Sequence, residues 1–251
     1  MKGLIRGFSF AFKGLGHLLG NPSLWGWSAL PVVLNIALFI GGIWAYIHFF
    51  PDLLGMIMDK PDIWYMWIVY VLLIILLVVA FALVVIFGFT AVGCIIAAPF
   101  LDLLSEKVEK QLGRVEEGGG FRQALGDMGK GLLTGLVTVV FFILSQLILL
   151  LLWFLPVIGG IAYAVMAPLV GGFFLAYEFH DFPLGRRHLT ARQRFSYVMA
   201  RLSETLGFGL AIFLTTMVPL VNFLYLPAAT VGATLLVRDQ EEREGETPAA
   251  G

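Results

Sequence analysis

The stretch Gly207–Val237 reads "GFGLAIFLTTMVPLVNFLYLPAATVGATLLV" and contains no Asp, Glu, Lys or Arg in 31 residues. Since a helix crosses the hydrocarbon core of a membrane in ~20 residues, this stretch exceeds one crossing and is too short for two. Pro219 and Asn222 near its middle favour a turn at depth. We therefore expect a re-entrant hairpin at 207–237, which is tolerated where its non-helical backbone is buried in protein or lines a water-filled cavity. A single full crossing, with the C-terminus outside, is the alternative.

The composition of the whole chain is that of an integral membrane protein. Of its 251 residues, 59% are hydrophobic and 13% are charged, whereas soluble domains are about half apolar and about a quarter charged. The chain has no basic domain of the kind that binds nucleic acid. Its single cysteine excludes an intrachain disulfide. The sequence contains no catalytic arrangement of Ser, His and Asp and no phosphate-binding loop, so we expect no enzyme activity, no cofactor and no bound metal.

Two further apolar runs predict long transmembrane helices at 28–50 and 63–92, because neither run contains a charged residue and each exceeds ~20 residues. A bend near Gly93–Pro99 is expected after the second run. It leads into an amphipathic helix at 99–113, which Gly113 would cap.

Residues 1–20 predict an amphipathic helix in the membrane surface. Basic and polar residues recur in steps of three or four from Lys2 to His17, opposite an apolar face that includes Ile5, Phe8 and Phe12. A basic helix with aromatic anchors lies at the interface instead of crossing it.

The predicted fold class is an all-α integral membrane protein of two long transmembrane helices, partly inserted re-entrant hairpins and interfacial amphipathic helices. An apolar region at 131–177, interrupted by "LPVIGG", supplies another helical hairpin. All these elements form a single membrane domain at 1–238. The charged tail at 239–251 lacks apolar periodicity and is predicted to be disordered.

The placement of positive charge predicts the orientation. Of the 16 Lys and Arg residues, Lys60 is the only one in the loop at 51–62. Because positive charge stays cytoplasmic, we expect this loop to lie outside. The N-terminus, the basic loops at 102–130 and 178–206, and the tail are then cytoplasmic.

The first transmembrane run begins with "GNPSLWGWSALPVVLN", Gly20–Asn35. Its Asn, Pro and Ser are typical of a helix start, whose unpaired N–H groups and positive dipole end attract oxyanions. The alternative for Asn21, Pro22 and Ser23 is a plain helix cap. The alternative for Trp25 and Trp27 is that they anchor the helix at the membrane interface. The candidates for anion binding are Asn21, Ser23, Leu24, Trp25 and Gly26.

Polar residues inside apolar runs are candidates for lining a pore. The alternative for Asn35 is a hydrogen bond to a neighbouring helix, and for Asn222 it is a partner for backbone groups freed at the turn. An arginine pair near residue 186 either forms an electropositive vestibule that draws anions or only sets the orientation. The pore-lining candidates are Asn35, Thr215, Thr216 and Asn222, and the vestibule candidates are Arg186 and Arg187.

Three blocks of the sequence resemble the CysZ-type sulfate permeases and the wider etoposide-induced-protein family. They are "NPSLWGWSALPVVLN" (Asn21–Asn35), "AAPFLDLLSEKVE" (Ala97–Glu109) and "YEFHDFPLGRRHLTARQRF" (Tyr177–Phe195), the last continued by Phe208–Thr234. The blocks stand in the family's order and cover the chain to about residue 238.

The resemblance implies two long transmembrane helices, partly inserted hairpins and sulfate uptake across the bacterial inner membrane by a homo-oligomer. In the sulfate permeases a Gly-Leu followed by a basic pair holds the anion. Here Ser23 precedes Leu24, Trp25 and Gly26 follow it, and no Arg or Lys occurs between residues 13 and 60. The charge-assisted bonds of the family site are therefore missing. The function expected is a permease for a small inorganic oxyanion, and the alternative is a non-transporting membrane-organising protein.

Overall fold

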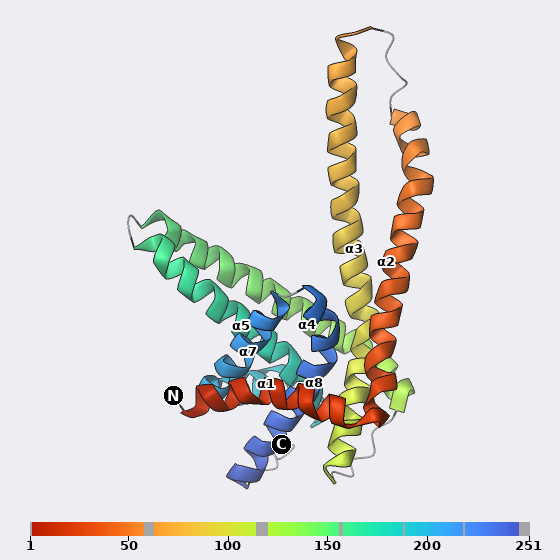
Figure 1. The fold of residues 1–251 in the computed structure, drawn as a ribbon. Coiled ribbons are helices and arrows are strands. Elements are labelled where there is room, and N and C mark those ends of the chain that lie inside the picture. The colour runs from red at the N-terminus through yellow and green to blue at the C-terminus, as the bar shows by residue number, and fades with distance from the viewer. Residues whose placement is uncertain are drawn as a thin grey trace. The chain divides into compact units, whose positions relative to one another are not determined.

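The computed structural model describes residues 2–57, 63–113, 120–155, 158–187, 189–217 and 219–245. Most of these residues are helical and none of them is in a strand, which confirms the predicted all-α fold (Figure 1). The elements in chain order are α1 (Lys2–Gly20), α2 (Pro22–Ile57), α3 (Met66–Gln111), α4 (Gly120–Leu150), η1 (Leu151–Phe154), α5 (Gly159–Gly185), α6 (Ala191–Ala200), α7 (Leu202–Thr216) and α8 (Pro219–Glu244).

Four helical segments among the described residues are long and apolar enough to cross a membrane: Pro22–Asp52, Met66–Leu83, Thr134–Phe154 and Gly159–Gly185. In each of these helices, no more than 17% of the 18-residue apolar stretch is buried inside the protein, as expected for helices that meet lipid. α6 and α7, bent by 93° at their junction, would add a fifth as one broken span. The count exceeds the two long transmembrane helices expected from sequence, because both helices of the 131–177 region reach spanning length.

The chain forms two compact units. The core unit comprises Met1–Ser28 and Pro99–Gly251, and the long-helix unit comprises Ala29–Ala98. In the long-helix unit α2 packs on α3 through aromatic rings, with the centroids of Tyr46 and Phe81 4.9 Å apart.

α3 is continuous from Met66 to Gln111, where the sequence predicts a bend near Gly93–Pro99 and a separate helix at 99–113. A proline inside a helix has a φ close to the helical value and removes one hydrogen bond to the residue four positions earlier. The helix continues through Pro99 in spite of that loss. The expected cap is present, since Gly113 has a φ of 81°.

The C-terminal apolar stretch folds as two helices, α7 and α8, that meet between Thr216 and Pro219. The turn comes earlier than the sequence predicts, because Pro219 starts α8 instead of interrupting it. Backbone N–H groups in the first turn of a helix have no partner within the helix, so proline, which lacks an N–H, is well tolerated there. Pro227 lies within α8.

α8 continues to Glu244, so the predicted disorder from residue 239 onward is wrong for residues 239–244. Gln240 and Glu241 are 1% and 8% exposed. Ion pairs with arginines elsewhere in the fold, such as Arg6 with Asp239 at 2.6 Å, hold this end of the helix. Residues 246–251 lie outside the described residues.

Glycines bring the backbones of the core helices into direct contact. A Cβ added to Gly7 would lie 1.9 Å from the carbonyl oxygen of Glu204, and one added to Gly209 would lie 1.9 Å from that of Gly172. The first contact joins α1 to α7 and the second joins α7 to α5. α1 is therefore a packed part of the core unit as well as an amphipathic helix.

Candidate functional site

A single residue, Asn21, separates α1 from α2. Its side-chain nitrogen Nδ2 donates to the carbonyl oxygen of His17 at 2.7 Å, and its own carbonyl accepts from the backbone N–H of Leu24 at 3.0 Å. The helix start expected at this stretch is present, with Pro22 at the first helical position. The side-chain amide of Asn21 is used to close the end of α1.

The next three anion-binding candidates have very different exposure. Leu24 is fully buried, so only its backbone can reach a ligand. Trp25 is half exposed, and its indole N–H donates to the carbonyl oxygen of Leu18 at 2.9 Å. At Gly26 an added Cβ would meet nothing within 4 Å. The turn is thus anchored by its apolar residues and open to solvent or lipid at the glycine.

Gln111, at the end of α3, bridges the two helices that meet at this turn. Its Nε2 donates to Oγ of Ser23 at 3.1 Å, and its Oε1 lies 3.2 Å from Nε2 of His17. Because the Ser23 hydroxyl accepts in this bond, its own proton remains available to a ligand. Three helices therefore present polar groups at one exposed place.

Lys107 brings a positive charge to the same turn from one helical turn earlier on α3. Its ammonium nitrogen lies 4.8 Å from the centroid of the Trp27 ring, a cation–π contact. It makes no ion pair within the described part of the chain. Lys107 and Gln111 are four residues apart and share a helix face. We call the group His17, Ser23, Trp27, Lys107 and Gln111 the turn cluster.

The arginine pair near residue 186 lies at the end of α5 and is surrounded by carboxylates. Nε of Arg186 lies 3.0 Å from Oε2 of Glu109, and its Nη1 lies 2.6 Å from Oδ1 of Asp102. Another guanidinium nitrogen donates to the hydroxyl of Ser105. Both carboxylates belong to the C-terminal part of α3, so Arg186 ties α5 to α3.

Arg187 is more deeply buried, with 2% of its side chain exposed. Its Nη2 lies 3.0 Å from Oε2 of Glu241 on α8, and its Nη1 lies 3.1 Å from Oε1 of Glu109. Burial alone would lower the pKa of Arg187, but the hydrogen bond to Glu241 and the two nearby carboxylates outweigh it and raise that pKa above its ordinary value.

Arg186 and Arg187, with Asp102, Glu109 and Glu241, form what we call the arginine clamp. Three carboxylates surround two guanidinium groups. This geometry does not fit the electropositive vestibule expected from the sequence, because the arginine charges are neutralised within the protein. The clamp instead joins α3, α5 and α8.

Of the four pore-lining candidates, the structure describes the side chains of Thr215 and Thr216. The hydroxyls of Thr215 and Thr216 donate to carbonyl oxygens of their own helix, Thr215 to Ala211 at 2.9 Å and Thr216 to Phe213 at 2.8 Å. Asn35 belongs to the long-helix unit, and the side chains of Asn35 and Asn222 lie outside what the structure describes. Pore lining by these residues stays a prediction.

Sequence reasoning missed Lys107, Gln111 and His17 as parts of the candidate site. The spacing of Lys107 and Gln111 places them on one face of a helix, and both lie in or next to a block that carries the family resemblance. That signal identifies a shared face. It does not reveal that the face lies beside Ser23, more than eighty residues away in sequence.

The profile of the family described as sulfate transporter CysZ/etoposide-induced protein 2.4 matches residues 10–227. A protein named sulfate transporter CysZ from Pseudomonas syringae pv. tomato is 32% identical over 233 residues, which cover 92% of this chain and 91% of that one. Those of the same name from Pseudomonas aeruginosa PAO1 and Pseudomonas fluorescens Pf0-1 are 30% and 29% identical, over 95% and 92% of this chain and 97% and 92% of theirs.

Proposed function

This chain belongs to the family of sulfate transporter CysZ and etoposide-induced protein 2.4, and we propose that it is a membrane permease for a small inorganic oxyanion, sulfate before others. The observation that carries the proposal is the turn cluster. The block that resembles the family's anion site lacks a basic pair, and next to it the ammonium of Lys107 on α3 lies 4.8 Å from the ring centroid of Trp27.

The chemistry of the turn cluster suits a tetrahedral oxyanion. The ammonium of Lys107 offers a charge-assisted hydrogen bond, and the hydroxyl of Ser23 and the start of α2 offer further donors. The indole N–H of Trp25 already donates to the carbonyl oxygen of Leu18, so it is not available to an anion. The backbone near Gly26 is unobstructed and is where an anion could approach. An anion here would replace part of its hydration shell by protein donors.

The exposure of the cluster favours passage over tight retention. Ser23 and Gln111 are exposed, and the Lys107 ammonium shares no carboxylate within the described residues. Conduction requires a site that an ion can enter and also leave. An exposed site with one lysine meets this requirement better than a buried cage of arginines would.

The remaining parts of the proposal concern the membrane. The α7–α8 hairpin enters the membrane from the cytoplasmic side and returns, and Thr215, Thr216 and Asn222 line its route. Asn35, in the long-helix unit, is a further pore-lining candidate. The protein works as a homo-oligomer in the bacterial inner membrane. Its N-terminus, basic loops and tail are cytoplasmic, since nearly all Lys and Arg residues lie in those segments.

A second candidate function is a non-transporting, membrane-organising role within the same family. The absence of Arg and Lys between residues 13 and 60 favours it, because the charge expected next to Leu24 is missing. A stable partner that copurifies with a protein lacking anion flux would support this alternative.

The purified protein in liposomes should take up radiolabelled sulfate above the level of empty vesicles. Lys107→Gln should lower the initial rate by roughly tenfold, because a hydrogen bond to a charged group contributes about 1.5–3 kcal/mol. Lys110→Gln is the matched control. It removes the same charge from the same end of α3, but Lys110 is paired with Glu106 at 2.5 Å, whereas Lys107 has no ion pair within the described residues.

Uptake of sulfate or another oxyanion no faster than in empty vesicles would reject the permease function. Equal loss in both lysine variants would reject the role of Lys107 while leaving the permease function standing. The two outcomes are distinguishable because the first concerns the unmodified protein.

A further inference from the structure

α1 has three faces with different surroundings. The first packs in the core unit and is made mostly of small residues. The second is apolar and exposed. The third is basic and polar. The buried face contains Gly7, Phe10, Ala11, Gly14 and Leu18, the exposed apolar face contains Leu4, Ile5, Phe8, Phe12 and Leu19, and the basic face contains Lys2, Arg6, Lys13 and His17.

The exposed apolar face cannot turn inward. A Cβ on Gly7 or Gly14 would lie 1.9 Å or 2.3 Å from the backbone oxygen of a neighbouring helix, so α1 lies against α7 and α8 with no room to rotate. Ile5 is 69% exposed and Phe12 is 47% exposed. In a membrane protein, such a face on a surface helix is the part that enters the acyl region next to the headgroups.

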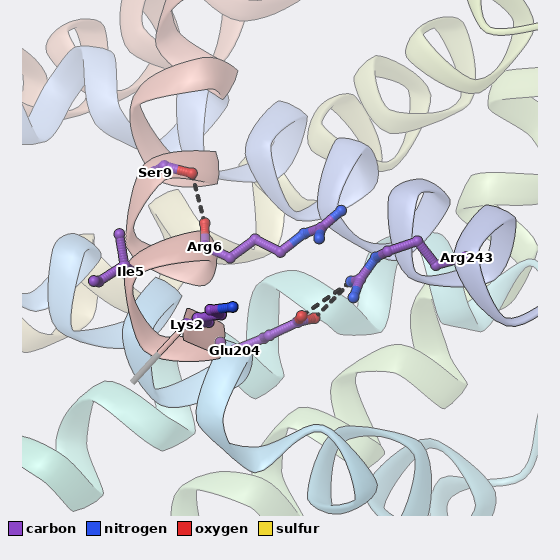
Figure 2. Close-up of a pocket in the computed structure, with 7 residues that line it drawn as sticks. Lys2, Ile5, Arg6, Ser9, Glu204 and Arg243 are labelled. Carbon is purple, nitrogen blue, oxygen red and sulfur yellow. Dashed lines mark hydrogen bonds and ion pairs between the residues drawn. The ribbon is translucent and has the colours of Figure 1, made fainter.

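A pocket of about 470 Å³ opens beside the first two turns of α1, between this helix, α7 and α8. Figure 2 shows Arg6 reaching from α1 toward Arg243 of α8, with Glu204 of α7 bound to Arg243. Lys2 and Ile5 also line the pocket. It therefore combines cationic side chains with one edge of the exposed apolar face.

The charges at this pocket do not balance. Asp239 accepts from Arg6 at 2.6 Å and lies 3.1 Å from Nε of Arg243, while Glu204 lies 3.0 Å from Nη2 of Arg243. Two carboxylates therefore serve two arginines. Lys2 makes no ion pair within the described part of the chain and adds an unmatched positive charge.

Arg6 and Arg243 also have N–H donors that make no hydrogen bond to the described residues. A guanidinium group has five N–H donors, and the bonds of Arg6 and Arg243 involve Nε and Nη2. Nη1 of each arginine makes no hydrogen bond to any described residue. An anion in the pocket would thus find an ammonium group and unused guanidinium donors without breaking an existing pair.

We propose that this pocket binds the headgroup of an anionic phospholipid, with the phosphate at Lys2 and the acyl chains along Ile5, Phe8 and Phe12. A phospholipid places its phosphate directly beside its apolar chains, and α1 places its basic face beside its exposed apolar face. The unmatched positive charge selects an anionic lipid, because a zwitterionic headgroup brings its own cation. A lysine near an anionic membrane surface contributes about 1 kcal/mol.

The test is native mass spectrometry of the full chain in detergent, with dioleoylphosphatidylglycerol or dioleoylphosphatidylcholine added. Phosphatidylglycerol adducts should predominate on the unmodified protein, and Lys2→Glu should weaken their binding at least about fivefold. Lys13→Glu is the matched control. It makes the same change on the same face of α1 but outside the pocket, where the ammonium lies 4.1 Å from the ring centroid of Phe10.

Several results would overturn the proposal. An equal loss of lipid binding in both variants would mean that general surface charge attracts the lipid. Unchanged lipid adducts in Lys2→Glu would show that the pocket is not the binding site. Displacement of the lipid by millimolar inorganic phosphate would assign the pocket to a free anion. Loss of dimers without loss of lipid would assign the face to a second copy of the chain. Lys2 is exposed, so circular dichroism of each variant should match the unmodified protein.

Discussion

Lys107 and Arg187 are both positive charges near blocks of family-like sequence, yet the fold gives them opposite surroundings. Lys107 lies over the ring of Trp27 with no carboxylate partner among the described residues. Arg187 is 2% exposed and pairs with both Glu109 and Glu241. Arg187 is enclosed by carboxylates and Lys107 is not, so the turn cluster is suited to binding and the arginine clamp to stability.

The largest effect that separates the two clusters is expected from Arg187→Ala. It removes the buried guanidinium that pairs with Glu109 and Glu241, and breaking a buried ion pair costs about 3–5 kcal/mol in the free energy of unfolding. The measurement is the fraction of protein that stays monodisperse in detergent after heating. Arg192→Ala on the exposed surface of α6 is the control and should behave like the unmodified protein. If the two variants were equally stable, the clamp would not hold the core unit together.

A gain of sulfate affinity is expected from Gly26→Arg, which places a guanidinium group beside the turn cluster. A new charge-assisted bond contributes about 1.5–3 kcal/mol, so the dissociation constant should fall at least about tenfold. Calorimetric titration with sulfate measures it. Gly20→Arg is the matched control, because an added Cβ at either glycine meets nothing within 4 Å. The same gain in both variants would indicate general electrostatics instead of a prepared site.

The smallest effect is expected from Gln111→Ala, which removes the bridge between His17 and Ser23. One neutral hydrogen bond contributes about 1 kcal/mol, so sulfate affinity should fall about fivefold. Thermal stability should change little because Gln111 is exposed. The opposite pattern, with lower stability and unchanged affinity, would give Gln111 a structural role and remove it from the turn cluster.

Much of the fold was predictable because membrane helices obey local rules. The length of an apolar run decides whether it can cross the hydrocarbon core, and the start of α2 near Pro22 and the cap at Gly113 follow from single residues. The exposed apolar face of α1 follows from the spacing of Ile5, Phe8 and Phe12. Each of these features depends on residues that are close in the chain.

The candidate site was predictable only in part. Asn21–Gly26 forms the turn expected of a helix start, but composition and spacing do not reveal that Gln111 contacts Ser23 or that Lys107 contacts Trp27. The prediction of disorder for residues 239–244 was wrong for a related reason. A run of charged residues is interpreted as solvent-exposed when its ion-pair partners are distant in the sequence. Arg6, Arg187 and Arg201 supply those partners.

From its amino acids alone this protein was bound to be a helical membrane protein of the CysZ-type family, because hydropathy, helix signals and family motifs are local properties. Which cations are neutralised and which remain free emerged only from the packing of α1, α3, α5, α7 and α8. Ion pairing depends on distances of a few ångströms between residues far apart in the chain, and folding alone sets those distances.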